Sequence, residues 1–271
     1  MKADFHVHTS NTDCSESPRQ VFKTAKENGV THIAITDHDT LYGQEEHRIL
    51  AEEFGLTHIP AVEISAYDYE NNKACHIVGL NALPGDKDLD IMMKSVTDQR
   101  HRNSDAQILR LMALGYDISF DDFIDKRGVH GVYKQHIMDV LRETGYVNDL
   151  FGDFYKKMFK NGGPLEMKIE YPSAVEAVKV LRNSGALPVL AHPSLYGNLE
   201  ILESLIDNGL MGIEAFYPVA TEKDREEIFT LAERYGLFIS GGSDFHGDYG
   251  NHSRFNVGDC YVDNIDFFIR R

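Results

Sequence analysis

Side chains that can bind metal ions recur along this chain beside short apolar runs. His6 and His8 lie two residues apart in the first run, and Asp13 follows in the next loop. If that run is a strand, both imidazoles point to one face, roughly 6.6 Å apart along the backbone. Two imidazoles placed in this way can bind one ion, although an isolated pair is equally typical of solvated histidines on an edge strand.

The same pattern is repeated further along the chain. Six more candidate ligands stand at the boundaries of apolar runs, most of them just after a run: His38, Glu63, His76, His192, Asp244 and His246. In a parallel α/β barrel the carboxyl ends of the strands meet at one face, where active sites form. The nine side chains together therefore predict a metal cluster on that face.

The composition of this candidate cluster favours more than one ion. Three carboxylates and six imidazoles exceed the roughly four to six donors that one ion takes. Nitrogen and oxygen ligands without thiolate suit Mn²⁺, Fe²⁺ or Zn²⁺. Adjacent ions lower the pKa of a shared water and neutralise phosphoryl oxygens. Because no Ser/His/Asp triad or phosphate-binding P-loop is evident, metal-bound hydroxide is the expected nucleophile.

The elements that must position these residues alternate between strands and helices. Eight runs have strand character: Asp4–Val7, His32–Thr36, His58–Ile64, His76–Leu80, Leu187–Ala191, Gly212–Phe216, Leu237–Ser240 and Asp259–Val262. Helix-start signals stand at Ser17-Pro18, at Ser173 and at Thr221. Strands that alternate with capped helices indicate parallel βαβ units.

One long segment interrupts this alternation. Residues 96–169 show no convincing strand and are typical of helices, which we expect at Ser95–Ala113, Phe120–Asp125, Gln135–Thr144 and Leu150–Lys160. We interpret the segment as a small helical domain that caps the substrate site, inserted into a barrel formed by residues 1–95 and 170–271. The alternative is two or three ordinary barrel helices joined by long loops.

Length, charge and cysteine usage exclude several classes of protein. The 271 residues fit one barrel-sized domain, and 27 Lys plus Arg against 43 Asp plus Glu give a net charge of −16. So acidic a chain disfavours duplex nucleic acid and anionic membranes as partners. Three cysteines without a CxxC pair indicate a reducing compartment. With neither a signal run nor a membrane-length apolar stretch, a cytoplasmic location is expected.

The motifs HVHTSNTD, TDHD, VEIS, CHIVGL, LAHP and GSDFHG together resemble the PHP (polymerase and histidinol phosphatase) family of metal-dependent phosphoesterases. The resemblance spans Met1 to about Asp248, and the helical segment is similar to the insert of the TrpH-like subgroup. It implies a distorted (β/α)7 barrel holding three divalent ions. It also distributes the ligands: His6, His8, Glu63 and Asp244 to the first ion; Glu63, His76 and His192 to the second; Asp13, His38 and His246 to the third.

The insert departs from the pattern of its relatives where substrate contacts are expected. The resemblance implies phosphate contacts from Arg102 and Asn103 on the first helix and from Lys134 and His136 on a later one. Arg254, shortly after the Asp244/His246 motif, is a further candidate cation at the rim of the pocket. Where relatives have Arg-Pro-His, this chain has Lys134-Gln135-His136. Lysine keeps the charge but loses the bidentate fork of arginine.

The predicted activity is hydrolysis of a phosphate ester of a small, multiply charged substrate. We expect catalytic roles for Asp13, His38, Glu63 and Asp244, with Asp13 or His38 assisting proton transfer to the leaving oxygen. The preferred substrate is a nucleotide resembling a 3′,5′-bisphosphate. Cyclic-phosphate phosphodiesterase, 5′–3′ exonuclease on short RNA and histidinol phosphatase share this site. A C–N-cleaving amidohydrolase and a non-catalytic metal-binding accessory module also stay open.

Overall fold

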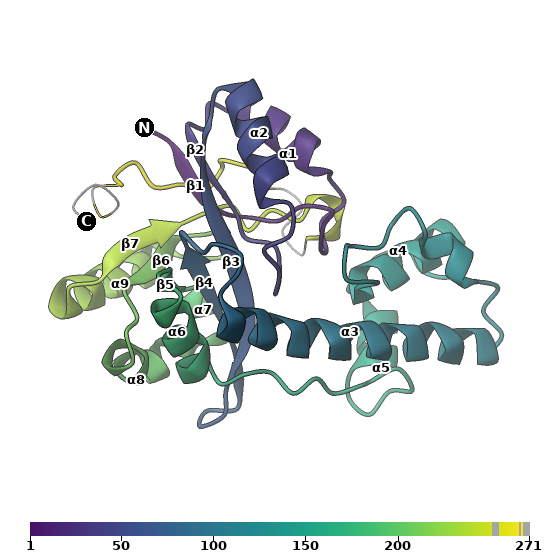
Figure 1. Cartoon of the computed structure of the whole chain (residues 1–271). Coiled ribbons are helices and arrows are strands. Elements are labelled where there is room, and N and C mark those ends of the chain that lie inside the picture. The colour runs from purple at the N-terminus through teal and green to yellow at the C-terminus, as the bar shows by residue number, and fades with distance from the viewer. Residues whose placement is uncertain (251–254, 266, 268–271) are drawn as a thin grey trace.

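Seven strands curl into a nearly closed barrel in the computed structural model, which describes residues 1–250, 255–265 and 267 (Figure 1). The strands follow one another in chain order: β1 (Ala3–Val7), β2 (His32–Ile35), β3 (Thr57–Asp68), β4 (Lys73–Leu80), β5 (Leu187–Leu190), β6 (Gly212–Phe216) and β7 (Phe238–Gly241). Beyond β7, Phe245 pairs with Val7 of β1, which brings the first and last strands together. The expected distorted (β/α)7 barrel is confirmed.

Helices cover the outside of the barrel and build a separate body beside it (Figure 1). The α-helices are α1 (Pro18–Glu27), α2 (Gln44–Phe54), α3 (Lys87–Ala113), α4 (Lys134–Glu143), α5 (Asp153–Phe159), α6 (Ala174–Asn183), α7 (Pro193–Tyr196), α8 (Leu202–Asp207) and α9 (Glu222–Tyr235). Short 3₁₀ turns are η1 (Phe120–Phe123), η2 (Asn198–Ile201) and η3 (Gly247–Tyr249). The predicted helix starts at Ser17, Ser173 and Thr221 are confirmed, because each of these side chains accepts a backbone N–H of its helix.

Two expectations about the strands are wrong. The run Asp259–Val262 forms no strand; Val262 alone makes an isolated bridge to Ala3, and its side chain is buried with Ala3 and Phe5. Burial beneath the barrel, rather than pairing in the sheet, explains its apolar character. The sheet is also not wholly parallel, because β4 runs antiparallel to both β3 and β5.

The antiparallel β4 changes where two candidate ligands lie. β3 continues to Asp68, so Glu63 stands inside the strand and not at its end. His76 stands inside β4 and is paired with Ser65 of β3. Because β4 runs in the opposite direction, its first half lies at the end of the barrel where the parallel strands finish. A ligand early in β4 therefore reaches the same rim.

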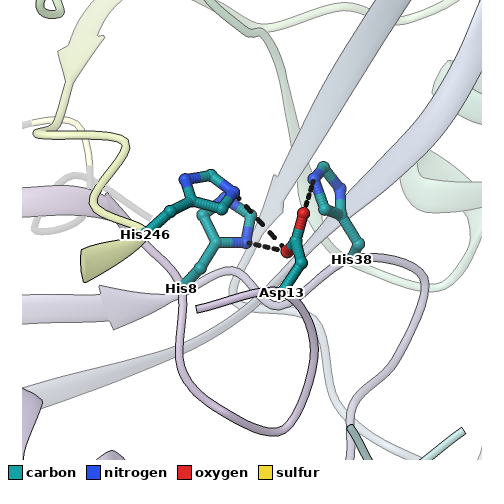
Figure 2. Close-up of side chains that lie close together, drawn as sticks. All are labelled: His8, Asp13, His38 and His246. Carbon is teal, nitrogen blue, oxygen red and sulfur yellow. Dashed lines mark ion pairs between the residues drawn. The ribbon is translucent and has the colours of Figure 1, made fainter. Parts of the chain in front are cut away.

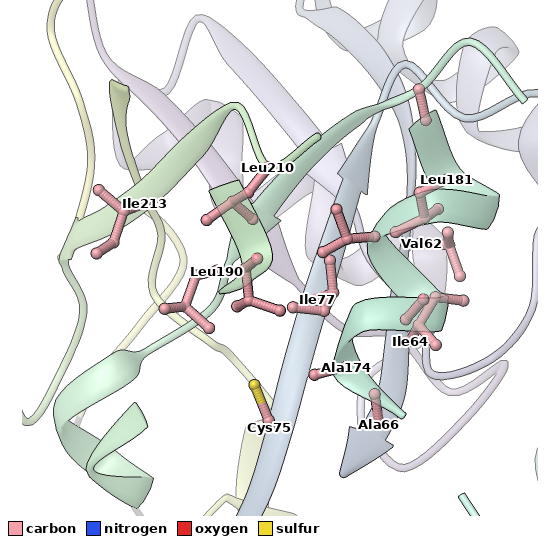
Figure 3. Close-up of a cluster of buried hydrophobic side chains, with 14 of the residues drawn as sticks. Val62, Ile64, Ala66, Cys75, Ile77, Ala174, Leu181, Leu190, Leu210 and Ile213 are labelled. Atoms are coloured by element: carbon pink, nitrogen blue, oxygen red, sulfur yellow. The ribbon is translucent and has the colours of Figure 1, made fainter. Parts of the chain in front are cut away.

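The outer face of the sheet is apolar and packs against α6 (Figure 3). Val62 and Ile64 of β3 and Ile77 of β4 alternate with the inward-facing ligands and meet Leu181 of α6. A Cβ on Gly79 would lie 2.5 Å from a Leu181 methyl carbon, so glycine allows the helix to approach the sheet this closely. Burial of these side chains fixes the register that turns Glu63 and His76 inward.

The expected helical insert lies beside the barrel (Figure 1). The 27-residue α3 begins at Lys87, eight residues before the expected start, because the Asp86 side chain caps it. The boundary proposed near residue 96 therefore falls within this helix, which extends from the barrel into the insert. Around its far end α4, α5 and η1 share a hydrophobic cluster of their own, which Tyr249 enters from the barrel.

Two further side chains are buried in the packing around the barrel. His47 of α2 is fully buried against Phe22 and His58, because α2 turns that face toward α1 and the sheet. Cys75 of β4 packs in the outer core on the face opposite His76. In the part of the chain that the structure describes, no helix combines the length and apolarity needed to cross a bilayer.

Candidate metal centre

The nine candidate ligands converge at one end of the barrel, which we call the metal cluster. They come from seven places along the chain: β1 and the loop after it, the segment after β2, the inner faces of β3 and β4, the residue before α7, and the segment after β7. His6, His8 and Glu63 are completely buried at the base of the cluster. The other ligands stand above them, toward an open cavity.

Glu63 lies at the centre of the cluster. Its Oε2 is 3.2 Å from His6 Nε2, 3.2 Å from His8 Nε2 and 3.1 Å from His38 Nδ1. Its Oε1 is 2.8 Å from His76 Nδ1 and 3.0 Å from His192 Nε2. Each carboxylate oxygen thus faces a different set of imidazoles, the arrangement that a carboxylate bridging two ions requires.

A second group of ligands surrounds Asp13 (Figure 2). Asp13 Oδ1 is 3.5 Å from His246 Nε2 and 4.0 Å from His8 Nδ1, and Oδ2 is 3.8 Å from His38 Nε2. Asp244 Oδ1 lies 3.4 Å from the Nε2 atoms of both His6 and His8. Because these distances exceed those of ordinary hydrogen bonds, the atoms are spaced for a shared cation.

The donor atoms satisfy two chemical requirements of a multinuclear site. Ligand atoms of His6, His8, Asp13, His38 and Glu63 are buried and have no hydrogen-bond partner among the described residues. Three sets of ligand atoms each lie within 4.8 Å of one another: His8/Asp13/His38/His246, His6/His8/Glu63/Asp244 and His38/Glu63/His76. His192 is in none of these sets, although it contacts Glu63 directly. Buried polar atoms without partners are costly, so the donors fit divalent cations.

Electrostatics within the cluster keeps its carboxylates ionised. Burial raises the pKa of Glu63, but the surrounding imidazoles hold that pKa well below its ordinary value. The pKa of Asp244 is lowered in the same way against its burial. Burial lowers the pKa of His246, yet the negative charge of Asp13 raises it overall to about 10. The carboxylates are therefore ionised and available as ligands, and a divalent ion that binds here displaces the proton of His246.

Two buried carboxylates that the sequence did not single out hold ligands in place. Glu214 of β6 accepts a hydrogen bond at Oε2 from the His192 backbone N–H at 2.7 Å, and its Oε1 lies 2.8 Å from His6 Nδ1. Asp37 accepts hydrogen bonds from the backbone N–H and hydroxyl of Thr9 and from the hydroxyl of Thr12. Glu214 thereby orients the His6 imidazole and holds the backbone of His192, and Asp37 fixes the loop that carries Asp13. An acidic residue inside an apolar strand was the available signal for Glu214.

Two ligands lie in strained backbone. His192 has φ of 28° and Asp244 has φ of 48°, values that non-glycine residues seldom adopt. Hydrogen bonds hold both positions: the His192 N–H donates to Glu214, and the Asp244 N–H donates to the His6 carbonyl at 2.8 Å. Such strain costs about 1–3 kcal/mol per residue and is typical of functional sites.

A cavity of about 320 Å³ opens above the cluster, between the barrel and the insert. Seven ligands line its floor: Asp13, His38, Glu63, His76, His192, Asp244 and His246. Its walls include aromatic residues of the insert and the barrel, among them Tyr133, Tyr155, Tyr171 and Tyr196. This volume suits a small molecule rather than a folded polymer.

The expected substrate contacts differ in where they lie. Asn103 and Lys134 line the cavity, and the Asn103 amide also donates to the Lys168 carbonyl. Arg102 is exposed on α3 and is not among the residues that line the cavity. His136 is buried and accepts a hydrogen bond from the Tyr133 N–H at 3.1 Å, which caps α4. Arg254 lies outside the described residues.

Arg100 reaches the cavity, although its position in the sequence is equally typical of a solvated helix residue. Its Nη2 donates to Asp39 Oδ2 at 3.0 Å and to Ser65 Oγ at 3.1 Å, and its guanidinium lies over the Tyr133 ring. Its Nη1 is buried without a hydrogen-bond partner among the described residues. A donor left free in this way, on a cation that lines the cavity, is suited to an anionic group of a ligand.

A family model described as the PHP domain matches residues 4–179. The chain belongs to the PHP domain family. A solved structure from Bifidobacterium adolescentis, described as a metal-dependent phosphoesterase, is 27% identical with a TM-score of 0.85, covering 96% of this chain and 92% of that one. The resemblance inferred from the motifs is confirmed.

Two curated relatives match almost the whole chain. One is the phosphoribosyl 1,2-cyclic phosphate 1,2-diphosphodiesterase of Eggerthella lenta, 37% identical and covering 95% of this chain and 99% of the relative. The other is the 3′,5′-nucleoside bisphosphate phosphatase of Chromobacterium violaceum, 28% identical and covering 90% of this chain and 86% of the relative. This PHP-domain protein is a metal-dependent phosphoester hydrolase.

Proposed function

We propose that this PHP-domain protein hydrolyses a cyclic phosphodiester on a phosphorylated sugar, with three divalent ions held by the nine ligands. The observation that carries the proposal is the cavity, which has the metal cluster on its floor and the cations Arg100 and Lys134 on its wall. The floor of the cavity suits a scissile phosphate, and the wall with the two cations suits a second anionic group. The match to the Eggerthella lenta relative over 95% of this chain and 99% of the relative supports the cyclic phosphate.

The two four-residue ligand sets, together with the contacts of Glu63 Oε1 with His76 and His192, support a division of roles within the cluster. We assign His6, His8, Glu63 and Asp244 to one ion, His76 and His192 with Glu63 to a second, and Asp13, His38 and His246 to a third. When bound, Mn²⁺, Fe²⁺ or Zn²⁺ at these sites lowers the pKa of coordinated water from about 15.7 toward 7 and neutralises phosphoryl charge.

The protein's own residues orient the substrate and move the proton. Arg100 and Lys134 bind the distal phosphate and so hold the ring phosphodiester over the metal cluster, while Asn103 adds a neutral donor. Asp13 or His38, both on the cavity floor, accepts the proton that the attacking water loses and passes it to the leaving oxygen as the ester bond breaks. Opening one P–O bond of the ring in this way yields a phosphomonoester.

A 3′,5′-bisphosphate nucleotide, which the sequence alone favoured, is the second candidate. It requires room for a base, and the aromatic side chains of Phe151, Tyr155 and Tyr171 line the cavity. Stacking on such rings would bind a base without selecting among bases. We rank it second because the Chromobacterium violaceum relative is less similar to this chain.

Turnover of defined substrates tests the proposal. Phosphoribosyl 1,2-cyclic phosphate, a nucleoside 3′,5′-bisphosphate, a 5′-phosphorylated RNA trimer and histidinol phosphate would be compared with the Mn²⁺-loaded enzyme. We expect the highest kcat/KM for the cyclic phosphate, and Arg100→Met should raise its KM. If the nucleotide, the RNA or histidinol phosphate gives a higher kcat/KM, the substrate assignment is wrong.

A further inference from the structure

Gln135, in the first turn of α4, contacts a candidate metal ligand. Its side-chain amide Nε2 donates a hydrogen bond to Asp13 Oδ2 at 2.8 Å. The other oxygen of Asp13, Oδ1, has no hydrogen-bond partner among the described residues and faces His246 and His8. The amide therefore engages one carboxylate oxygen and leaves the second directed into the cluster.

Gln135 is itself held rigidly. It is the second residue of α4, whose first turn is capped by the hydrogen bond from the Tyr133 N–H to His136. The buried face of α4 packs Ile137 and Met138 into the hydrophobic cluster of the insert. A glutamine in the first turn of a packed helix presents its amide from a fixed backbone position.

The loop that carries Asp13 is also held against the insert. The Val129 N–H donates to the Asn11 carbonyl at 2.8 Å. A Cβ on Gly128 would lie 2.5 Å from the same carbonyl oxygen, so only glycine lets the backbone of the insert come this close to the backbone of the loop. Asp13 is thus fixed by Asp37 from the barrel side and by the insert from the other side.

We propose that Gln135 is a positioning residue for the ion bound by Asp13, and that through it the insert controls how tightly that ion is held. The inference rests on the three-ion site proposed above. Hydrogen bonds to ligating carboxylates typically change metal affinity by roughly 10- to 100-fold. Loss of the Gln135 amide should therefore weaken the ion at Asp13 and leave the ions centred on Glu63 unchanged.

Titration of the metal-free protein with Mn²⁺, followed by calorimetry without substrate, tests this inference. Gln135→Leu removes the donor. Gln135→Glu keeps the shape and suits a helix N-terminus, but it places a second carboxylate against Asp13. Gln99→Leu is the matched control, because Gln99 ties α3 to the Glu170 backbone and is not among the residues that line the cavity.

We expect three equivalents in the parent protein and in Gln99→Leu. In Gln135→Leu one of the three equivalents, the ion at Asp13, should lose roughly 10- to 100-fold in affinity, and in Gln135→Glu it should lose at least as much. If Gln135 only filled space, the Gln135→Glu variant would bind Mn²⁺ with the affinity of the parent protein. Three equivalents of parental affinity in both Gln135 variants overturn the inference alone, whereas fewer than three in the parent protein overturn the three-ion proposal and this inference with it.

Discussion

Lys134 gives the proposed substrate contact a measurable pH dependence. It lines the cavity, and burial lowers its pKa to about 8, with the charges of Lys160 and Arg100 acting in the same direction. The ammonium is therefore mostly charged at pH 7, half neutral near pH 8, and charged in about one molecule in eleven at pH 9. Because only the charged form pairs strongly with phosphate, substrate capture should weaken above pH 8.

The size of the effect follows from the hydrogen bond that the Lys134 ammonium would donate to the substrate phosphate. A hydrogen bond to a charged group contributes about 1.5–3 kcal/mol, which corresponds to roughly 10- to 150-fold in kcat/KM. Lys134→Met should lower kcat/KM by this factor at pH 7, mainly through KM. In the parent enzyme kcat/KM should fall about tenfold per pH unit above pH 8, until it meets the value of the variant.

Steady-state profiles from pH 6.5 to 9.5 with a metal-saturated enzyme provide the assay. Lys134→Arg is the matched control, because a guanidinium stays charged across this range. Its profile should lose the decline that begins near pH 8. If the parent and Lys134→Arg profiles coincide above pH 8, Lys134 does not bind the substrate in its charged form.

Three further outcomes follow from the packing around the site. Glu214→Gln should lower metal affinity by roughly 10- to 100-fold, because the amide binds the His6 imidazole less strongly; unchanged metal content after dialysis would contradict this. Burial lowers the pKa of His47 to about 3, so below pH 6.5 the unfolded chain binds a proton that the folded protein does not, and the free energy of unfolding falls. At pH 5 this decrease is about 2 kcal/mol, and urea unfolding of the metal-free His47→Leu variant should show no such decrease. Tyr249→Phe, which removes the hydrogen bond to Asp139 at 2.9 Å, should cost about 1 kcal/mol of unfolding free energy, and equal midpoints would refute that.

The convergence of the nine candidate ligands could be predicted from sequence because it depends on a simple periodicity. His6 and His8, and likewise Asp244 and His246, lie two residues apart at the barrel rim. The direction of β4 could not be read in this way, since an apolar run has the same appearance in either orientation. His76 nevertheless reaches the expected rim because β4 is antiparallel.

Residues that act from the insert were harder to assign. Arg100 and Arg102 are two residues apart on one helix, and the choice between them depends on how α3 is rotated against the barrel. Glu214 has no partner nearby in sequence; its contacts to His6 and His192 exist only once the barrel closes. Tertiary packing, which local pattern does not encode, decides such positions.

Anomalous diffraction at the manganese edge from crystals of the Mn²⁺-loaded protein tests the central claim most directly. We expect three peaks within one cluster, with Glu63 shared by two of them and Asp13 at the third. A single peak, or peaks that lie away from Glu63, would contradict a multinuclear centre assembled at the rim of this barrel.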